Sequence, residues 1–182
     1  SVTWESHMHF TMNMLSATTG LRLGEIQAIK RKYVHPEHIE IAYSWGRKYG
    51  LKETKNYGKR DVPIPPRVSE NLTLHIESNN LKEWDFVFYH PDKPGEPVDH
   101  KTVAIELYKA FELIGIKPEE REKRNVTFHS WRHFFNTYFR SKIHDSKLRR
   151  ITGHKTKAMT EHYTHFQIED FLDVVELQEG IF

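Results

Sequence analysis

The stretch TGLRLGE (residues 19–25) separates two segments whose apolar residues follow a helical period. Upstream, residues 4–16 repeat apolar side chains at approximately the spacing of one helix face. Gly20 is a natural helix stop, because glycine adopts the backbone conformation that ends helices at little cost. Downstream, residues 21–32 resume the helical pattern. The sequence therefore predicts two helices that meet at Gly20, with Arg22 just beyond the break.

The helical period is lost after residue 36. Residues 38–45 (HIEIAYSW) alternate isoleucines with polar neighbours, which is typical of a strand. Residues 61–65 (DVPIP) read as a second short strand, which its two prolines confine to a sheet edge or terminus. Residues 47–60 between them are polar, basic and interrupted by glycines. We expect a small antiparallel sheet near the N-terminal side of the chain, with its strands joined by a long basic loop.

The remaining segments favour helices, apart from a short extended stretch over residues 84–89. Helical patterns are expected over residues 67–79, 101–115, 130–142, 146–152 and 157–163. The end of the chain carries an apolar stripe at Ile168, Phe171, Leu172 and Val175. We therefore predict an α+β fold that is mostly helical, with one domain over residues 1–165 and an acidic amphipathic tail or helix over residues 166–182.

The net charge of +2 hides an asymmetry between the body of the chain and its tail. Six of the 25 acidic residues lie in residues 161–182, which contain no Lys or Arg, so the other 160 residues carry a net charge of +8. A basic body with an acidic tail favours a nucleic-acid partner. The absence of cysteine excludes a disulfide scaffold, a thiolate zinc site and a cysteine nucleophile. No run approaches the length of an apolar membrane span, so we expect a cytoplasmic protein without a membrane partner.

Four short segments carry side chains that are suited to phosphate chemistry. They are TGLRLGE (19–25), Thr54-Lys55, HSWRH (129–133), and Gly153-His154 followed by Tyr163. The guanidinium groups of Arg22 and Arg132 are permanently charged and forked, so they can hold two oxygens of one phosphate. The tyrosine is a competent oxygen nucleophile once its proton is removed. Because magnesium sites need carboxylates, this set without an acidic cluster indicates a metal-free phosphate site.

Each of these residues also has a simpler interpretation on its own. Arg22 could be a solvated surface residue, Tyr163 a half-buried aromatic, and the basic loop a solvated surface. His129 and His133, at i and i+4, could bind zinc, but HSWRH lacks the glutamate of the HExxH motif and no third ligand is evident. The joint occurrence of the four segments in one order favours the phosphate site, with no metal.

The order and spacing of the four segments resemble the catalytic domain of the tyrosine recombinase (phage integrase) family, over about residues 3–175. The resemblance implies that fold. It implies a site-specific recombinase or integrase that cleaves and rejoins DNA through a 3′-phosphotyrosyl intermediate, without metal, ATP or another cofactor. It also implies an N-terminal core-binding domain, which this sequence does not contain.

The resemblance further implies six catalytic residues, namely Arg22, Lys55, His129, Arg132, His154 and Tyr163. The two arginines would clamp the scissile phosphate and stabilise its transition state. Tyr163 would be the nucleophile, and His129 would accept its proton. His154 would donate to a phosphate oxygen.

The implied role of Lys55 is to protonate the departing 5′ oxygen. Lys52 and Lys59 lie close enough in the sequence to compete for this role. Two further residues, Glu25 and His133, would hold the catalytic groups in position without contacting the DNA themselves.

Double-stranded DNA is the expected partner. The basic loop supplies the expected DNA contacts, which are Arg47, Lys48, Lys59 and Arg60. We expect self-association on DNA as a tetrameric synapse with the tail exchanged between subunits, and the alternative is a tail folded back on its own domain. The alternative functions are a DNA-binding module of the same fold with little activity, a type IB topoisomerase-like nicking and closing activity, and a metal-dependent phosphoesterase built on the histidines.

Overall fold

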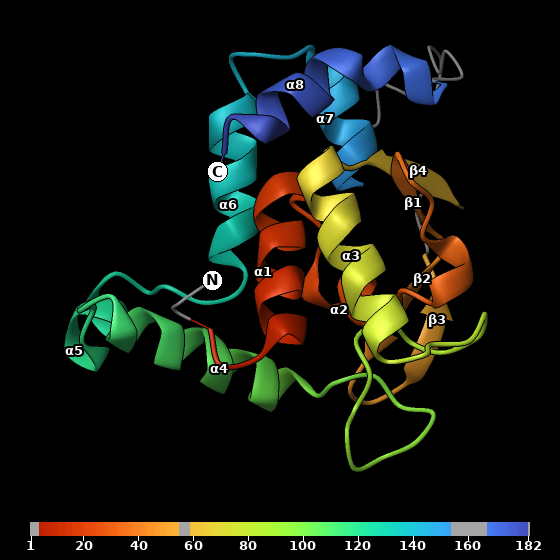
Figure 1. The fold of residues 1–182 in the computed structure, drawn as a ribbon. Coiled ribbons are helices and arrows are strands. Elements are labelled where there is room, and N and C mark those ends of the chain that lie inside the picture. Colours follow the sequence, from red (N-terminus) through yellow and green to blue (C-terminus); the bar gives the residue numbers. More distant parts are fainter. Residues whose placement is uncertain (1–3, 55–58, 154–166, 182) are drawn as a thin grey trace.

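The computed structural model describes residues 4–54, 59–153 and 167–181. Within these residues the fold is α+β and mostly helical, with antiparallel strands near the N-terminal side, as predicted (Figure 1). The elements in chain order are α1 (His7–Thr19), α2 (Leu23–Gln27), η1 (Arg31–Tyr33), β1 (His38–Ile41), β2 (Tyr43–Gly46), β3 (Gly50–Glu53), β4 (Arg60–Pro63), α3 (Pro66–Ser78), α4 (His100–Leu113), α5 (Pro118–Lys123), α6 (Ser130–Phe139), α7 (Asp145–Thr152), η3 (Ile168–Phe171) and α8 (Leu172–Glu179).

The central helix is α1, with α3, α4 and α6 packed around it (Figure 1). It extends to Thr19, beyond the predicted end at residue 16, and the hydroxyls of Thr18 and Thr19 donate to carbonyls of the preceding turn. Gly20 then adopts a left-handed conformation with φ of 63°, and its N–H donates to the carbonyl of Ser16 at 2.9 Å. The predicted helix stop at Gly20 is therefore confirmed.

The helix predicted over residues 21–32 is much shorter in the structure. α2 ends at Gln27, and the backbone that follows pairs with a segment far along the chain before it forms the short turn η1. The N–H groups of Arg31 and Lys32 donate to the carbonyls of Asp85 and Glu83, each at 3.0 Å. This pairing holds the extended stretch at residues 84–89, which is rich in aromatic residues, against the end of α2 and close to the strands.

In the part of the chain that the structure describes, the strands form two antiparallel pairs. β1 pairs with β4, with Ile39 opposite Val62, and β2 pairs with β3, with Gly46 opposite Gly50. The single strand predicted over residues 38–45 is thus two strands, and part of the predicted loop over residues 47–60 is strand β3. The predicted strand at residues 61–65 is confirmed as β4, which starts one residue earlier.

Helix α6, in the C-terminal half of the domain, packs against α1. Phe135 and Phe139 on α6 are fully buried, and their rings lie 4.3 Å apart. A Cβ on Gly20 would lie only 2.6 Å from Cδ1 of Phe135, so α6 contacts α1 closely where α1 ends. This contact places the start of α6 beside the TGLRLGE segment.

The described part of the tail, residues 167–181, docks on its own domain. Phe171 and Val174 are buried in the common core, and the Nε2 of Gln178 donates to the carbonyls of Thr18 and Pro63 at 2.9 and 3.0 Å. Of the predicted apolar stripe, Phe171 faces inward while Leu172 is 66% exposed. The described part of the tail thus has the arrangement of the alternative, a tail folded back on its own domain, and exchange between subunits stays a prediction. Among the described residues, no helix combines the length and the apolar character that a membrane crossing requires.

Candidate active site

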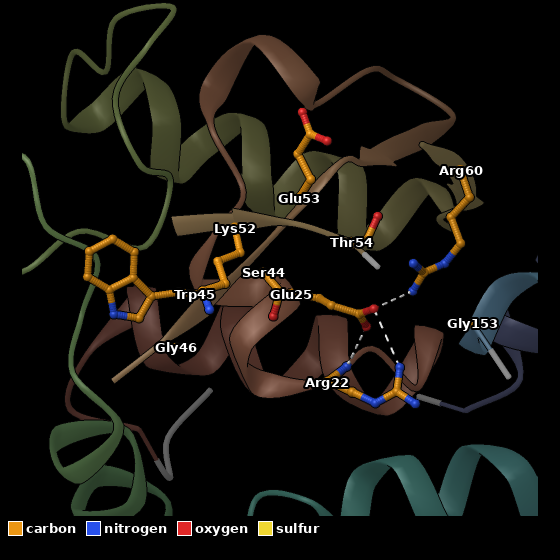
Figure 2. Close-up of a pocket in the computed structure, with 10 residues that line it drawn as sticks. All are labelled: Arg22, Glu25, Ser44, Trp45, Gly46, Lys52, Glu53, Thr54, Arg60 and Gly153. Atoms are coloured by element: carbon orange, nitrogen blue, oxygen red, sulfur yellow. Dashed lines mark hydrogen bonds and ion pairs between the residues drawn. The ribbon is translucent and has the colours of Figure 1, made fainter. Parts of the chain in front are cut away.

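An open pocket of about 270 Å³ lies where the start of α2, the β2–β3 hairpin, β4 and the end of α7 meet (Figure 2). Its lining residues are Arg22, Glu25, Ser44, Trp45, Gly46, Lys52, Glu53, Thr54, Arg60 and Gly153. Segments that are far apart in the sequence therefore converge on one cavity. Its lining includes Arg22 and Glu25 of the TGLRLGE segment and the glycine that precedes His154.

Arg22 occupies the N-terminal end of α2. Its backbone N–H donates to Oε2 of Glu25 at 3.0 Å, which satisfies a group that the helix leaves unpaired. The Nη1 of its guanidinium lies 3.6 Å from Oε1 of Glu25 and donates to the carbonyl of Thr152 at 3.5 Å. The side chain is 44% exposed, so this cation is held by the protein and also open to an anion from solvent.

Arg132 reaches the same place from α6 and is almost completely buried. Its guanidinium donates to the carbonyls of Gly20 and Thr152, both at 2.7 Å. Burial and, secondly, the positive charge of Arg22 lower the pKa of Arg132 to about 10. Arg132 therefore remains a cation at neutral pH.

The backbone carbonyl of Thr152 is thus a shared acceptor for two arginines from different helices. Two like charges repel, and the carbonyl oxygen at the end of α7 compensates them in part. An anion with several oxygens, such as a phosphodiester, would compensate them further. The arrangement is therefore suited to binding a phosphate.

Glu25 and Arg60 form a buried ion pair behind Arg22. Oε1 of Glu25 accepts from Nη2 of Arg60 at 2.9 Å, and both side chains are nearly inaccessible to solvent. The Nε of Arg60 also donates to the carbonyl of Ile151 at 3.0 Å. Figure 2 shows Glu25 between the two guanidinium groups.

The placement of Arg60 in an exposed DNA-contacting loop is wrong. Arg60 is the first residue of β4 and lies on the same strand face as Val62, which is fully buried. A side chain with 2% exposure offers no surface to DNA. The signal that sequence reasoning missed is the strand period, because Arg60, Val62 and Ile64 alternate with residues of the other face.

His129 precedes α6, and its ring lies 4.9 Å from that of His133 in an edge-on arrangement. Partial burial lowers the pKa of His129, and the neighbouring His133, Arg132 and Arg22 lower it further. A neutral imidazole can accept a proton, so the surroundings of His129 favour a proton acceptor at neutral pH. No cluster of three potential metal ligands occurs in residues 4–54, 59–153 and 167–181.

The remaining predicted residues divide into three groups. Lys52 lines the pocket from β3, and its Nζ lies 3.7 Å from the ring centroid of Tyr49. Lys59 is exposed and pairs with Glu40 at 3.0 Å, while Arg47 and Lys48 are exposed at the hairpin turn. Three predicted catalytic residues lie outside the described residues, namely Lys55, His154 and Tyr163.

Gly24 has no predicted role beyond its place in the TGLRLGE motif, yet it determines how the hairpin meets α2. A Cβ at this position would lie 2.5 Å from the carbonyl oxygen of Trp45 and 2.8 Å from Oγ of Ser44. Glycine therefore lets β2 approach the first turn of α2, which closes one wall of the pocket.

The fold is that of the catalytic domains of tyrosine recombinases. The model of the phage integrase family matches residues 5–169, and this chain belongs to that family. No curated protein matches the chain significantly in sequence.

Several solved recombinase structures share the fold. The Tn1549 transposon integrase in complex with transposon right end DNA has a TM-score of 0.67 and 20% identity, over 88% of this chain and 56% of that one. XerA recombinase has a TM-score of 0.62 and 19% identity, over 97% and 57% of the two chains. A lambda integrase tetramer bound to a Holliday junction has a TM-score of 0.56 and 19% identity, over 89% and 44%. The chain thus spans about half the length of these structures.

Proposed function

We propose that this chain is the catalytic part of a site-specific DNA recombinase or integrase, in which residues 1–165 form the catalytic domain and 166–182 its tail. The observation that carries the proposal is the convergence of Arg22 and Arg132 on the carbonyl of Thr152. Two fixed cations beside an open pocket are suited to the charge that develops on a phosphodiester under attack. Membership of the phage integrase family supports the same conclusion.

In the proposed reaction the phenolic oxygen of Tyr163 attacks the scissile phosphorus, and the bond from phosphorus to the 5′ oxygen breaks. His129 takes the phenolic proton, and Lys55 gives a proton to the departing 5′ oxygen. The product is a 3′-phosphotyrosyl link and a free 5′-hydroxyl. Attack by the 5′-hydroxyl of another strand then restores a phosphodiester and frees the tyrosine, so the reaction needs no ATP.

The arginines would hold the non-bridging oxygens throughout, with His154 as a further donor. Glu25 fixes the backbone and the side chain of Arg22, which supports its proposed role behind the reacting groups. Because Lys52 lines the pocket, it stays an alternative to Lys55 as the proton donor. His133 contacts the ring of His129 and would help to keep it neutral.

For binding, we propose that double-stranded DNA lies over the pocket and contacts the exposed Arg47, Lys48 and Lys59. The relatives whose structures contain DNA, and the lambda integrase tetramer, support a DNA partner and self-association on DNA. Exchange of the tail between subunits would require the docked tail to leave its own domain first.

Covalent capture from a pool of DNA sequences tests the proposed reaction and selects the target site in the same experiment. A pool of nicked duplexes with a randomised core traps the intermediate, because the fragment beyond the nick diffuses away after cleavage. We expect a covalent protein–DNA complex that survives SDS and EDTA and disappears in Tyr163→Phe. Sequencing the captured DNA then identifies a preferred site.

The other outcomes identify the alternatives. DNA binding without a covalent complex would contradict the enzyme proposal and leave a binding module. A complex that requires a divalent metal would favour the phosphoesterase, and relaxation of any supercoiled plasmid without site preference would favour topoisomerase-like activity.

A further inference from the structure

We infer that Arg60 is a positioning residue for the phosphate site: its buried guanidinium fixes Glu25, and through it Arg22, relative to the end of α7. This inference rests on the proposed function and deepens it. The geometry joins three separate elements, α2, β4 and α7, at a single side chain (Figure 2).

The first connection runs from Arg60 to Arg22 through Glu25. One carboxylate oxygen of Glu25 accepts from Arg60 at 2.9 Å, and the other accepts from the backbone N–H of Arg22 at 3.0 Å. The Nη1 of Arg22 lies 3.6 Å from the oxygen that Arg60 already occupies. Arg60 therefore competes with the Arg22 side chain for the negative charge of Glu25.

This competition has a direct consequence for an incoming anion. Without Arg60, the buried carboxylate would have Arg22 as its nearest cation, and the pair would tighten because the surroundings have a low dielectric. The guanidinium of Arg22 would then be drawn toward Glu25 and away from the pocket. Arg60 thus leaves Arg22 available to a phosphate.

The second connection runs from Arg60 to the end of α7. Its Nε donates to the carbonyl of Ile151, and Gly153 lies directly against the guanidinium. A Cβ on Gly153 would be 3.2 Å from Cζ of Arg60, and the φ of Gly153 is +67°. Arg60 therefore supports Gly153, the left-handed residue that ends α7 directly after the shared acceptor Thr152.

Arginine is the residue type that this position requires. Its planar fork donates in two directions at once, to a carboxylate and to a carbonyl on different elements. A lysine would supply a single point charge and would leave one of the two acceptors without its donor. The 2% exposure of Arg60 also distinguishes this role from DNA contact.

The test compares Arg60→Gln, Arg60→Lys and Arg60→Ala with the wild type, on the DNA that covalent capture recovers. Single-turnover cleavage is measured at saturating DNA, and the dissociation constant is measured at several salt concentrations. Arg124→Gln is the matched control, because Arg124 is an exposed arginine directly after α5 that pairs with Glu120. Circular dichroism monitors folding in every variant.

We expect Arg60→Gln to cleave more slowly by roughly tenfold to a hundredfold, as a misplaced catalytic group causes. We expect its affinity and salt dependence to change much less than its cleavage rate, since the exposed cations that contact the DNA backbone stay in place. Arg60→Lys is expected to cleave faster than Arg60→Gln. Millimolar guanidinium, against sodium at equal concentration, is expected to accelerate Arg60→Ala but not Arg124→Gln, which a purely structural role would not produce.

Each other result overturns the inference in a distinct way. A wild-type cleavage rate in Arg60→Gln removes the positioning role, and a loss confined to affinity and its salt slope makes Arg60 a DNA contact. If Arg60→Gln does not fold, Arg60→Lys is decisive, and unfolding of all three variants assigns Arg60 to folding alone. A wild-type chain that forms no covalent complex overturns the proposed function as well, whereas an active wild type with an equally active Arg60→Gln overturns only this inference.

Discussion

The indole N–H of Trp131 on α6 donates to Oδ1 of Asn13 on α1 at 2.8 Å. Asn13 is buried, and its amide group donates in turn to the carbonyl of His9. This hydrogen bond joins the two helices one residue before Arg132, whose guanidinium contacts the carbonyl at the end of α1. The pair therefore contributes to the alignment of α6 that the candidate site needs.

We expect Trp131→Leu to lower the free energy of unfolding by about 1–3 kcal/mol, because it leaves the buried oxygen of Asn13 without its donor. The double variant Trp131→Leu with Asn13→Leu should recover part of this loss, since it removes both polar partners. Urea denaturation measures the free energy of unfolding of the two single variants, Trp131→Leu and Asn13→Leu, and of the double variant. A double variant whose loss equals the sum of the two single losses would contradict the coupling.

Gly20 and Gly115 both have positive φ angles, of 63° and 86°, but only Gly20 is packed against a neighbour. Alanine at either position is strained by about 1–2 kcal/mol in the left-handed region. At Gly20 the new Cβ also meets Phe135, so Gly20→Ala should cost about 1–3 kcal/mol more than Gly115→Ala. Equal losses in thermal denaturation would show that α6 gives way easily at this contact.

Arg132→Lys keeps the positive charge but loses the fork that bridges the carbonyls of Gly20 and Thr152. If this fork orients the phosphate-binding group, single-turnover cleavage should fall by about a hundredfold or more. The substitution Lys123→Arg on α5, which is exposed, is the control for exchange of the two residue types. A rate within the range of this control would show that charge alone is sufficient at position 132.

The stability of the domain should decrease as the pH falls below the ordinary histidine pKa of 6.5. Burial lowers the pKa of both His9 and His75, so the unfolded chain binds more protons than the folded chain between the lowered values and 6.5. The stability that the neutral rings contribute is fully present above that range and is lost through it as the pH falls. Urea midpoints across this range measure the slope, and His9→Phe should flatten it; an unchanged slope would exclude His9 as a contributor.

Gln178 on α8 holds the tail against the body through two backbone carbonyls. Gln178→Met has a similar volume but no donor, so we expect a loss of about 1–3 kcal/mol from the two carbonyls left unpaired. Glu179→Ala, at an exposed position on the same helix, is the control. Proteolysis at the tail compared with global unfolding would show whether the loss is local to α8.

Much of the fold could be predicted because its signals are local. The stop at Gly20 follows from its own backbone freedom, and the α6 and α7 patterns follow from the helical period. The early end of α2 could not be predicted, because its cause is pairing with Glu83 and Asp85, whose place beside it is a property of the tertiary structure. Strand β3 was also missed, since it has only one apolar side chain and three of its four positions are exposed.

For the candidate site, the sequence predicted which residues come together better than it predicted their burial. The structure brings Arg22, Glu25 and Arg132 to one place, as the joint order of the segments suggested. The burial of Arg60 was missed although the strand period places it on the same face as Val62, because a charged residue beside a basic loop is usually exposed. Its partner, Glu25, lies next to it only after folding.

The docked tail also changes how assembly on DNA should be viewed. If tails are exchanged between copies, each tail would make in the neighbouring copy the same contacts that Phe171, Val174 and Gln178 make in their own domain. Such a domain swap gains little contact energy, so its equilibrium depends on the effective concentration of neighbouring copies. The free chain would stay closed and monomeric, and crowding of copies on adjacent DNA sites would be sufficient to open it.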